Sequence, residues 1–379
     1  LIDVSRLVIP SELGGKPVVS IAGGFADNLR VNTLVIPSTV KTIEPSAFVD
    51  CSIEEIIFSD TLENVSDSSF GYEAIPVWRI NAVKRPVFLS RMDFTYFSDN
   101  MDRLMLSRDK KKMVFFAGCS MGYGLNSPAV AESFSDYEIF NFGLLGGSDA
   151  GVQLDMITSS VGEGDVFVHA PEEGSTYQLM LDRTADLRIF VLVEGNYDLL
   201  SFADMSGVKQ AFDSFASFNT VRKNFPYGNY TDCLDTYNEY GDFIGKHPDG
   251  GEDKPIGSEP YTFIVDKISR GTLLELCKKY HNISEKGAEV LFSFAPINYH
   301  GLPREDVDRE IWYEYQSLCE QNLGMYGGYR VISSVKDYVM EGRYFYDSDY
   351  HLGEGGAALR TARLIEDLKR HLGGRGFEK

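Results

Sequence analysis

Apolar residues recur at regular intervals along the first 75 residues of the chain. Short apolar runs begin at Leu7, Leu34 and Ile56, and the last two begin 22 residues apart. Two further positions recur in each segment: Ile21, Ile43 and Val65, and then Phe25, Phe48 and Phe70. A short period with one apolar strand per unit predicts a solenoid, because each unit buries its apolar face only against its neighbours.

The repeated unit resembles the BspA-like class of leucine-rich repeats, and the segment Leu34 to Cys51 carries that resemblance most fully. The first unit has an additional turn from Gly14 to Pro17. The resemblance implies a binding or adhesive surface. Three units are close to the minimum for a stable solenoid, so we favour the alternative that residues 1–75 form a structural cap on the domain that follows.

The spacing of apolar residues changes after a segment that we interpret as a linker, residues 76–109. Between residues 110 and 379, continuous apolar runs alternate with helical patterns. The expected strands cover residues 113–117, 137–142, 165–170, 187–193 and 290–295. The expected helices cover residues 127–134, 148–160, 268–280, 304–322 and 357–371. This alternation predicts an α/β domain with a doubly wound parallel sheet, interrupted by an aromatic-rich insertion at about 196–261.

Composition narrows the range of functions. Hydrophobic residues make up 43% of the chain and the net charge is −20, which indicates a globular protein and argues against binding to nucleic acid or anionic membranes. No apolar run reaches the 18 residues that a membrane span needs. The five cysteines show no CxxC and suggest neither a disulfide framework nor a zinc site. The chain begins inside the repeats, so we expect that a signal peptide has been removed and that the protein is extracellular or on the cell surface.

Two segments carry candidate chemistry. Gly118-Cys119-Ser120 follows the first expected strand, and Asp347-Ser348-Asp349-Tyr350-His351 precedes the last helix. Ligands of α/β folds bind at the carboxyl ends of the strands, so we expect the Ser120 hydroxyl to face outward into a pocket. Ser120, a histidine and an acid would together supply a nucleophile, a base and an orienting group for acyl transfer.

These segments, together with Asn141-Phe142-Gly143-Leu144-Leu145-Gly146, resemble the ordered blocks of the SGNH (GDSL-like) hydrolase superfamily. The resemblance implies that Ser120 is the nucleophile, His351 the base and Asp347 the acid. It also implies that the backbone N–H groups of Ser120 and Gly146 bind the oxyanion.

The sequence departs from the SGNH pattern at three places. Cys119 replaces the usual Asp, and as a nucleophile it is a lesser rival of Ser120. Position 348 is Ser, so Asp347 and Asp349 compete for the role of the acid, and we favour Asp347. The expected oxyanion Asn is missing, and Glu172 stands near its position. A carboxylate donates a hydrogen bond only when protonated, so Glu172 has another task or the oxyanion hole uses backbone N–H groups alone.

The sequence therefore predicts a serine esterase that removes acyl groups, most simply acetyl, from a carbohydrate. Aromatic residues of the insertion offer surfaces for stacking on sugars, with packing of the insertion itself as the alternative: Tyr227, Tyr230, Tyr237, Tyr240 and Phe243. An O-acyltransferase with the same triad and a non-catalytic adhesive protein remain alternatives. No P-loop, dinucleotide fingerprint or HExxH motif is present, so we expect no cofactor and no metal ion. No feature of the sequence indicates an oligomeric state.

Overall fold

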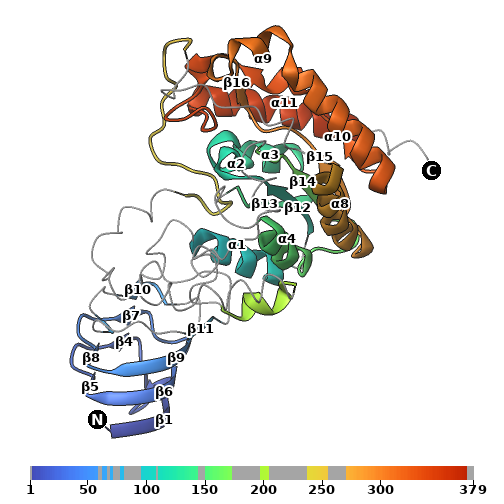
Figure 1. Ribbon diagram of the computed structural model, residues 1–379. Coiled ribbons are helices and arrows are strands. Elements are labelled where there is room, and N and C mark those ends of the chain that lie inside the picture. The colour runs from blue at the N-terminus through green and yellow to red at the C-terminus, as the bar shows by residue number, and fades with distance from the viewer. Residues whose placement is uncertain are drawn as a thin grey trace. The chain divides into compact units, whose positions relative to one another are not determined.

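The computed structural model describes residues 2–58, 62–65, 69–70, 77–80, 95–107, 110–143, 150–172, 197–204, 237–254 and 270–373. The chain divides into two compact units (Figure 1). Unit 1 contains Leu1–Leu106 and Leu187–Leu234, and unit 2 contains Ser107–Asp186 and Asp235–Lys379. The insertion that we expected at about 196–261 is thus shared between the two units. The expected strand at residues 187–193 lies outside the described residues.

Unit 1 contains a parallel sheet built from the repeats. Its strands, in spatial order, are β1 (Ile2–Val8), β6 (Leu29–Val35), β9 (Ser52–Phe58) and β11 (Val77–Ile80). Leu34 pairs with both Leu7 and Ile56, the positions that the sequence repeat aligns. The solenoid predicted from the period is therefore present. Strand β11 lies in the segment that we interpreted as a linker, so the repeat sheet extends beyond residue 75.

Shorter strands form the other sides of each repeat. Strands β4 (Ser20–Ile21), β7 (Thr42–Ile43) and β10 (Asn64–Val65) form one parallel sheet, and β5 (Ala26–Asp27) pairs with β8 (Phe48–Val49). The additional turn of the first unit is a hairpin between β2 (Glu12–Leu13) and β3 (Lys16–Pro17). Its two central residues, Gly14 and Gly15, both have positive φ, which glycine adopts without strain.

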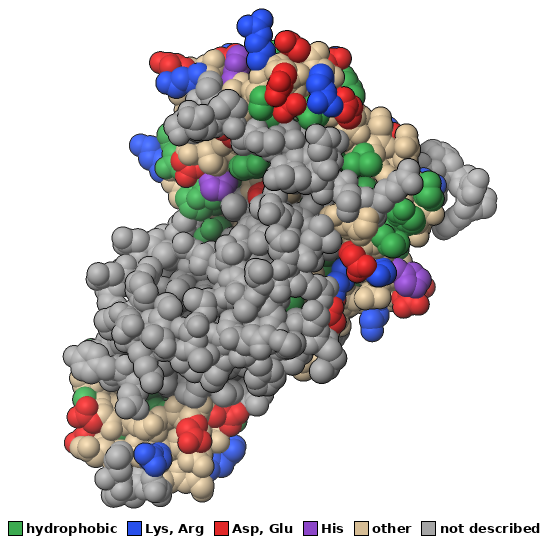
Figure 2. All heavy atoms as spheres, viewed as in Figure 1, with side chains coloured by type: hydrophobic (Ala, Val, Ile, Leu, Met, Phe, Trp, Pro, Cys, Tyr) green, Lys and Arg blue, Asp and Glu red, His purple; other side chains and the backbone are tan. Residues whose placement is uncertain are grey.

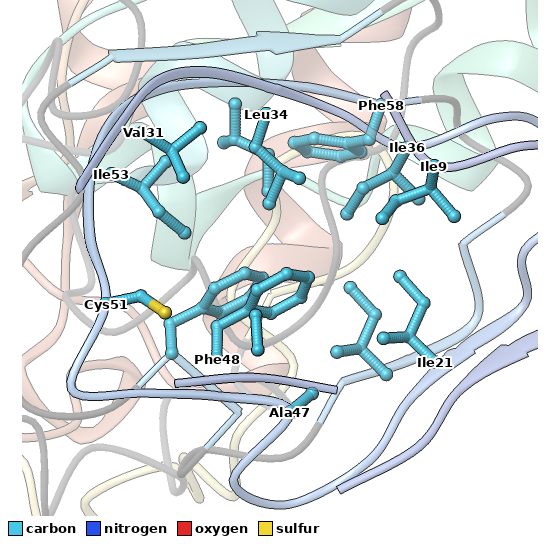
Figure 3. Close-up of a cluster of buried hydrophobic side chains, with 14 of the residues drawn as sticks. Ile9, Ile21, Val31, Leu34, Ile36, Ala47, Phe48, Cys51, Ile53 and Phe58 are labelled. Carbon is cyan, nitrogen blue, oxygen red and sulfur yellow. The ribbon is translucent and has the colours of Figure 1, made fainter. Parts of the chain in front are cut away.

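These sheets enclose an apolar core to which successive repeats contribute neighbouring side chains, such as Ile9 and Ile36 (Figure 3). The recurring phenylalanines stack along one side of this core. The rings of Phe48 and Phe70 are parallel with centroids 5.3 Å apart, and Phe25 meets the edge of Phe48 at 5.6 Å. Phe48, which contacts both other rings, is 1% exposed, whereas Phe25 is 48% exposed.

Helical segments complete the described part of unit 1. They are α1 (Thr95–Leu106) and the short 3₁₀ helix η2 (Tyr197–Phe202). Phe97, Met101 and Leu104 are buried on one face of α1, at the spacing of an amphipathic helix. The segment expected as a linker thus carries both a strand of the repeat sheet and a helix with a buried face.

Unit 2 is built on a five-stranded parallel sheet. In spatial order its strands are β13 (Tyr137–Asn141), β12 (Lys111–Phe116), β14 (Val166–His169), β15 (Glu289–Phe292) and β17 (Arg330–Val331). Four of these strands coincide with expected ones, whereas the two-residue β17 was not expected. The spatial order 2-1-3-4-5 is one of the two common orders of doubly wound sheets. The α/β class expected from the sequence is thus observed.

Helices cover both faces of this sheet. Helices α2 (Cys119–Gly124), α3 (Ser127–Ser133) and α11 (Glu354–Gly373) pack together on one face, where Met113 and Phe115 of β12 meet Leu364 and Leu368 of α11. Helices α4 (Ala150–Thr158), α8 (Arg270–Glu285) and α10 (Ile311–Gly327) form the other layer.

The prediction of a single helix at residues 304–322 is wrong. The chain forms α9 (Arg304–Asp308) and α10, separated by Glu310 in a left-handed conformation with φ of 50°. No glycine or proline marks this break, which explains why the pattern of apolar residues missed it.

Short elements flank α9 and α10. Strand β16 (Ile297–Asn298) and the 3₁₀ helix η5 (Tyr299–Gly301) precede α9, whereas η6 (Val335–Tyr338), β18 (Val339–Met340) and η7 (Gly342–Tyr344) lie between α10 and α11. Strands β16 and β18 pair in parallel. None of the described helices is both long enough and apolar enough to cross a bilayer. Acidic and basic side chains are interspersed on the described part of the face that Figure 2 shows. This mixture is consistent with the interpretation that the net charge of −20 keeps the protein in solution.

Candidate active site

The candidate site lies where the order of the parallel strands reverses. The chain passes from β12 to β13 on one side and later to β14 on the other, so the carboxyl ends of β12 and β14 flank a topological switch point. Ligands of doubly wound folds bind at this point. Ser120 lies four residues after the end of β12, in the first turn of α2, and Glu172 lies three residues after the end of β14.

The backbone of Ser120 is held on both sides by buried ionisable groups. Its N–H donates to Oε1 of Glu172 at 2.8 Å, and its carbonyl oxygen accepts from Nη1 of Arg360 at 3.2 Å. Arg360 comes from α11 and is completely buried, and this burial lowers the pKa of its guanidinium to about 10, which leaves it charged at neutral pH. The turn that carries the candidate nucleophile is therefore firmly positioned.

The side chain of Ser120 is fully buried, which corrects the expectation of a hydroxyl open to a pocket. Among the described residues, no group makes a hydrogen bond to Ser120 Oγ. The serine–histidine hydrogen bond of a working triad is thus not formed in this structure.

Glu172 fits over the turn because Gly118 has no side chain. A Cβ at Gly118 would lie only 2.3 Å from the carboxyl carbon of Glu172. Gly118 has φ of −75°, so its backbone does not require glycine and the need is for space alone. Glu172 therefore takes up the Ser120 N–H, a task that sequence reasoning had left open.

Asp347 and His351 are brought together at the start of the last helix. Nδ1 of His351 lies 2.7 Å from Oδ1 of Asp347. The Asp347 side chain is 49% exposed and that of His351 is 20% exposed. Ser348 fixes the turn between them, because its Oγ accepts the backbone N–H groups of Tyr350 and His351. An acid bonded to Nδ1 leaves Nε2 as the atom able to accept a proton.

Asp349 is engaged elsewhere. Its side chain is buried, and its Oδ1 accepts a hydrogen bond from Nδ2 of Asn298. Its carboxyl group also packs against Gly301, where a Cβ would lie 2.7 Å from the carboxyl carbon. These contacts attach Asp349 to the segment from β16 to η5.

An aromatic stack links His351 to the helix that carries Ser120. The imidazole of His351 lies parallel to the ring of Tyr123, with centroids 4.1 Å apart and an interplanar angle of 7°. The opposite face of Tyr123 stacks on Phe243, also at 4.1 Å. Tyr123 follows Ser120 by three residues on α2, so its side chain lies on a neighbouring part of the same helix surface. Sequence reasoning missed this stack, because its members are far apart in the chain.

The insertion segment 237–254 packs against Tyr123 and against the start of α11. Phe243 uses one face on Tyr123, and Tyr237 meets Phe243 edge-on at 5.7 Å. Asp249 accepts the backbone N–H groups of Gly355 and Gly356 and so caps the first turn of α11. Tyr237 and Phe243 thus pack within the protein, which was the alternative to stacking on a sugar. Tyr227 and Tyr230 lie outside the described residues.

Asn141, at the end of β13, forms hydrogen bonds that connect three segments near the candidate site. Asn141 Nδ2 donates to Asp242 and to the carbonyl of Met121, while its Oδ1 accepts the N–H of Gly143. Burial raises the pKa of Asp242 despite these and further donated hydrogen bonds. The Asn141 side chain thus joins the end of β13 to α2 and to the insertion.

Two predicted features cannot be placed. Gly146, expected to donate to the oxyanion, and the side chain of Cys119 lie outside the described residues. Within the described residues, no three His, Cys, Asp or Glu side chains gather in a way that would hold a metal ion.

Comparison with family models identifies the repeats. Residues 22–102 match the BspA type leucine rich repeat region. Among curated proteins, none matches the chain. The N-terminal part of the chain therefore consists of BspA-type leucine-rich repeats, followed by a mixed α/β unit with a mostly parallel sheet.

Proposed function

We propose that unit 2 is a serine esterase of the SGNH type that removes acyl groups from a carbohydrate. The observation that carries this proposal is the Asp347–His351 pair, whose imidazole stacks on Tyr123 three residues after Ser120. The position of Ser120 at the switch point of the sheet gives further support.

The proposed reaction proceeds through an acyl-enzyme. Ser120 Oγ attacks the ester carbonyl as Nε2 of His351 takes its proton, and Asp347 holds the resulting imidazolium. The C–O bond to the sugar then breaks, and the sugar oxygen receives the proton from His351. Water, deprotonated by Nε2 of His351, attacks the acyl-enzyme, and His351 returns the proton to Ser120 Oγ as the bond between Oγ and the acyl carbon breaks and the acid leaves. The first step requires Ser120 Oγ to turn toward His351.

A fluorophosphonate probe tests the nucleophile directly. We expect it to label the wild-type protein and the control Ser135→Ala, which changes an exposed serine, but not Ser120→Ala. Hydrolysis of an aryl acetate should fall by several orders of magnitude in Ser120→Ala and in His351→Ala. Equal labelling of wild type and Ser120→Ala would refute the assignment.

A non-catalytic binding protein is the second candidate. It is favoured by the complete burial of Ser120 and by the carboxylate that occupies its N–H. The BspA-type repeats would then supply the binding surface, and their resemblance to that class supports a location outside the cell or on its surface. Absence of labelling and of esterase activity in every variant, with sugar or protein binding that depends on the repeats, would establish it.

An O-acyltransferase would use the same acyl-enzyme and pass the acyl group to a sugar hydroxyl instead of water. Mass spectrometry of sugars incubated with the enzyme and an acyl donor separates the two reactions. Acylated sugar as the main product, with little free acid, would replace the esterase assignment by the transferase.

A further inference from the structure

Glu172 occupies the donor that acyl transfer at Ser120 needs. When a hydroxyl attacks an ester, negative charge develops on the carbonyl oxygen and is stabilised by N–H groups about 2.7–3.1 Å away. The N–H of Ser120 is one such donor in the proposed site, and it already donates to Oε1 of Glu172 at 2.8 Å. One N–H cannot serve both oxygens at full strength.

The carboxylate also opposes the reaction through its charge. An ionised carboxylate is an acceptor only, so it offers no hydrogen bond to a second oxygen. A developing oxyanion next to it would be repelled, because charges of the same sign interact strongly where water is excluded. Glu172 is 4% exposed, so water does little to screen it.

The structure holds Glu172 at this place through several independent features. It follows β14, the strand next to β12, and the pairing of Phe116 with His169 sets the two strand ends at the same level. Gly118 leaves the space for the carboxyl group. Arg360 lies near enough for its charge to interact with that of Glu172. The contact is thus part of the packing at the switch point.

We propose that Glu172 is an occluding residue, which keeps the site in a resting form by taking the Ser120 N–H until a substrate carbonyl displaces it. This inference rests on the proposed esterase function. It assigns to Glu172 a role opposite to that of a side chain that donates to the oxyanion. Removing its charge should therefore speed acylation of Ser120.

The test compares Glu172→Gln, Glu172→Asp and wild type. Gln keeps the size of the side chain, removes the charge and adds an N–H₂ donor, so we expect fluorophosphonate labelling and kcat/KM for an aryl acetate to rise at least tenfold. Asp keeps the charge, but its side chain is shorter by one methylene, so the carboxylate lies farther from the Ser120 N–H. We therefore expect a smaller rise in labelling and in kcat/KM. It also provides a second reading if the Gln variant folds poorly, which circular dichroism would reveal.

Two controls define the gain. Glu163→Gln makes the same change at an exposed position and should leave both rates unchanged. Ser120→Ala combined with Glu172→Gln should abolish labelling, which shows that the gain occurs at Ser120.

The outcomes separate this inference from the proposed function. Wild type that labels at Ser120, with Glu172→Gln and Glu172→Asp no faster, overturns the occluding role and leaves the esterase intact. Labelling of Glu172→Gln alone, at Ser120, supports both. Absence of labelling in wild type and in both Glu172 variants overturns the esterase and the occluding role together.

Discussion

Replacing Asp347 by Asn tests the acid of the triad at the residue that touches His351. Nδ1 and Oδ1 lie 2.7 Å apart, but the carboxyl group is 49% exposed, so water competes for it. A hydrogen bond to a charged group contributes about 1.5–3 kcal/mol, which corresponds to a roughly 10- to 150-fold change in rate. Exposure places Asp347→Asn near the lower end, at about a tenfold loss of kcat in aryl acetate hydrolysis. The free energy of unfolding of the Asp347→Asn variant should differ from that of wild type by less than about 0.5 kcal/mol.

Asp349→Asn is the matched control and should show the opposite pattern. Asp349 is buried, and its Oδ1 accepts from Asn298, so the substitution should lower the free energy of unfolding by about 1–3 kcal/mol. The kcat per folded molecule should stay close to that of wild type. Urea denaturation and the same hydrolysis assay measure both quantities. A larger loss of kcat at 349 than at 347 would refute the assignment of the acid.

Three further predictions concern stability. Phe48→Ala should lower the free energy of unfolding by about 3–5 kcal/mol and Phe25→Ala by about 1 kcal/mol, because the first ring is buried and the second is half exposed; equal losses in urea denaturation would contradict the stacking argument. Burial lowers the pKa of His169 from 6.5 to about 3, so the unfolded chain binds this proton more strongly and stability present above pH 6.5 is lost as the pH falls toward 3. We expect a loss of about 1 kcal/mol between pH 6 and 5 from this group, and a flatter profile in His169→Asn; an identical profile would exclude His169 as its source. Arg360→Met should lower the free energy of unfolding by about 3–5 kcal/mol by leaving Glu172 without its neighbouring positive charge, and Arg360→Met with Glu172→Gln should recover part of that loss; strictly additive losses would show that the two groups are not coupled.

The repeats could be predicted because their residues recur in register with the strand pairing. A leucine or isoleucine at the same point of each 22-residue unit is both a sequence signal and a partner across the sheet, as Leu34 and Ile56 show. The extent of the solenoid was harder to predict. Strand β11 pairs with β9, but its sequence, Val-Trp-Arg-Ile, does not repeat the Leu-Val-Ile-Pro pattern of the first two units.

The core strands of unit 2 were predictable for another reason. Strands that are buried on both faces are continuous apolar runs, and a glycine or proline follows each of the four expected runs that lie in unit 2. The two residues of β17 are too few to show any period, and the break at Glu310 has no characteristic residue. Such features depend on contacts between elements, which a local pattern does not contain.

The candidate site also combines features that a local segment suggests with contacts that only the fold creates. The turn at Ser120 and the pair Asp347–His351 are local, and a short stretch of sequence is enough to suggest each of them. The contact between Glu172 and Ser120 spans 52 residues and arises only because β12 and β14 are neighbours in the sheet. The stack of Phe243, Tyr123 and His351 likewise joins three distant segments.

The order of the strands therefore determines more of the chemistry at Ser120 than the residues of its own turn do. Given the pairing of Phe116 with His169, residues shortly after each must meet at the carboxyl edge of the sheet, whatever their chemical type. A side chain that donates at position 172 would complete an oxyanion hole, whereas a carboxylate there withdraws the Ser120 N–H from it. Resemblance to a family predicts where such a residue lies. The effect of that residue on the reaction depends on its charge. Glu172→Gln is therefore the smallest substitution that we expect to change inhibition of acylation at Ser120 into assistance.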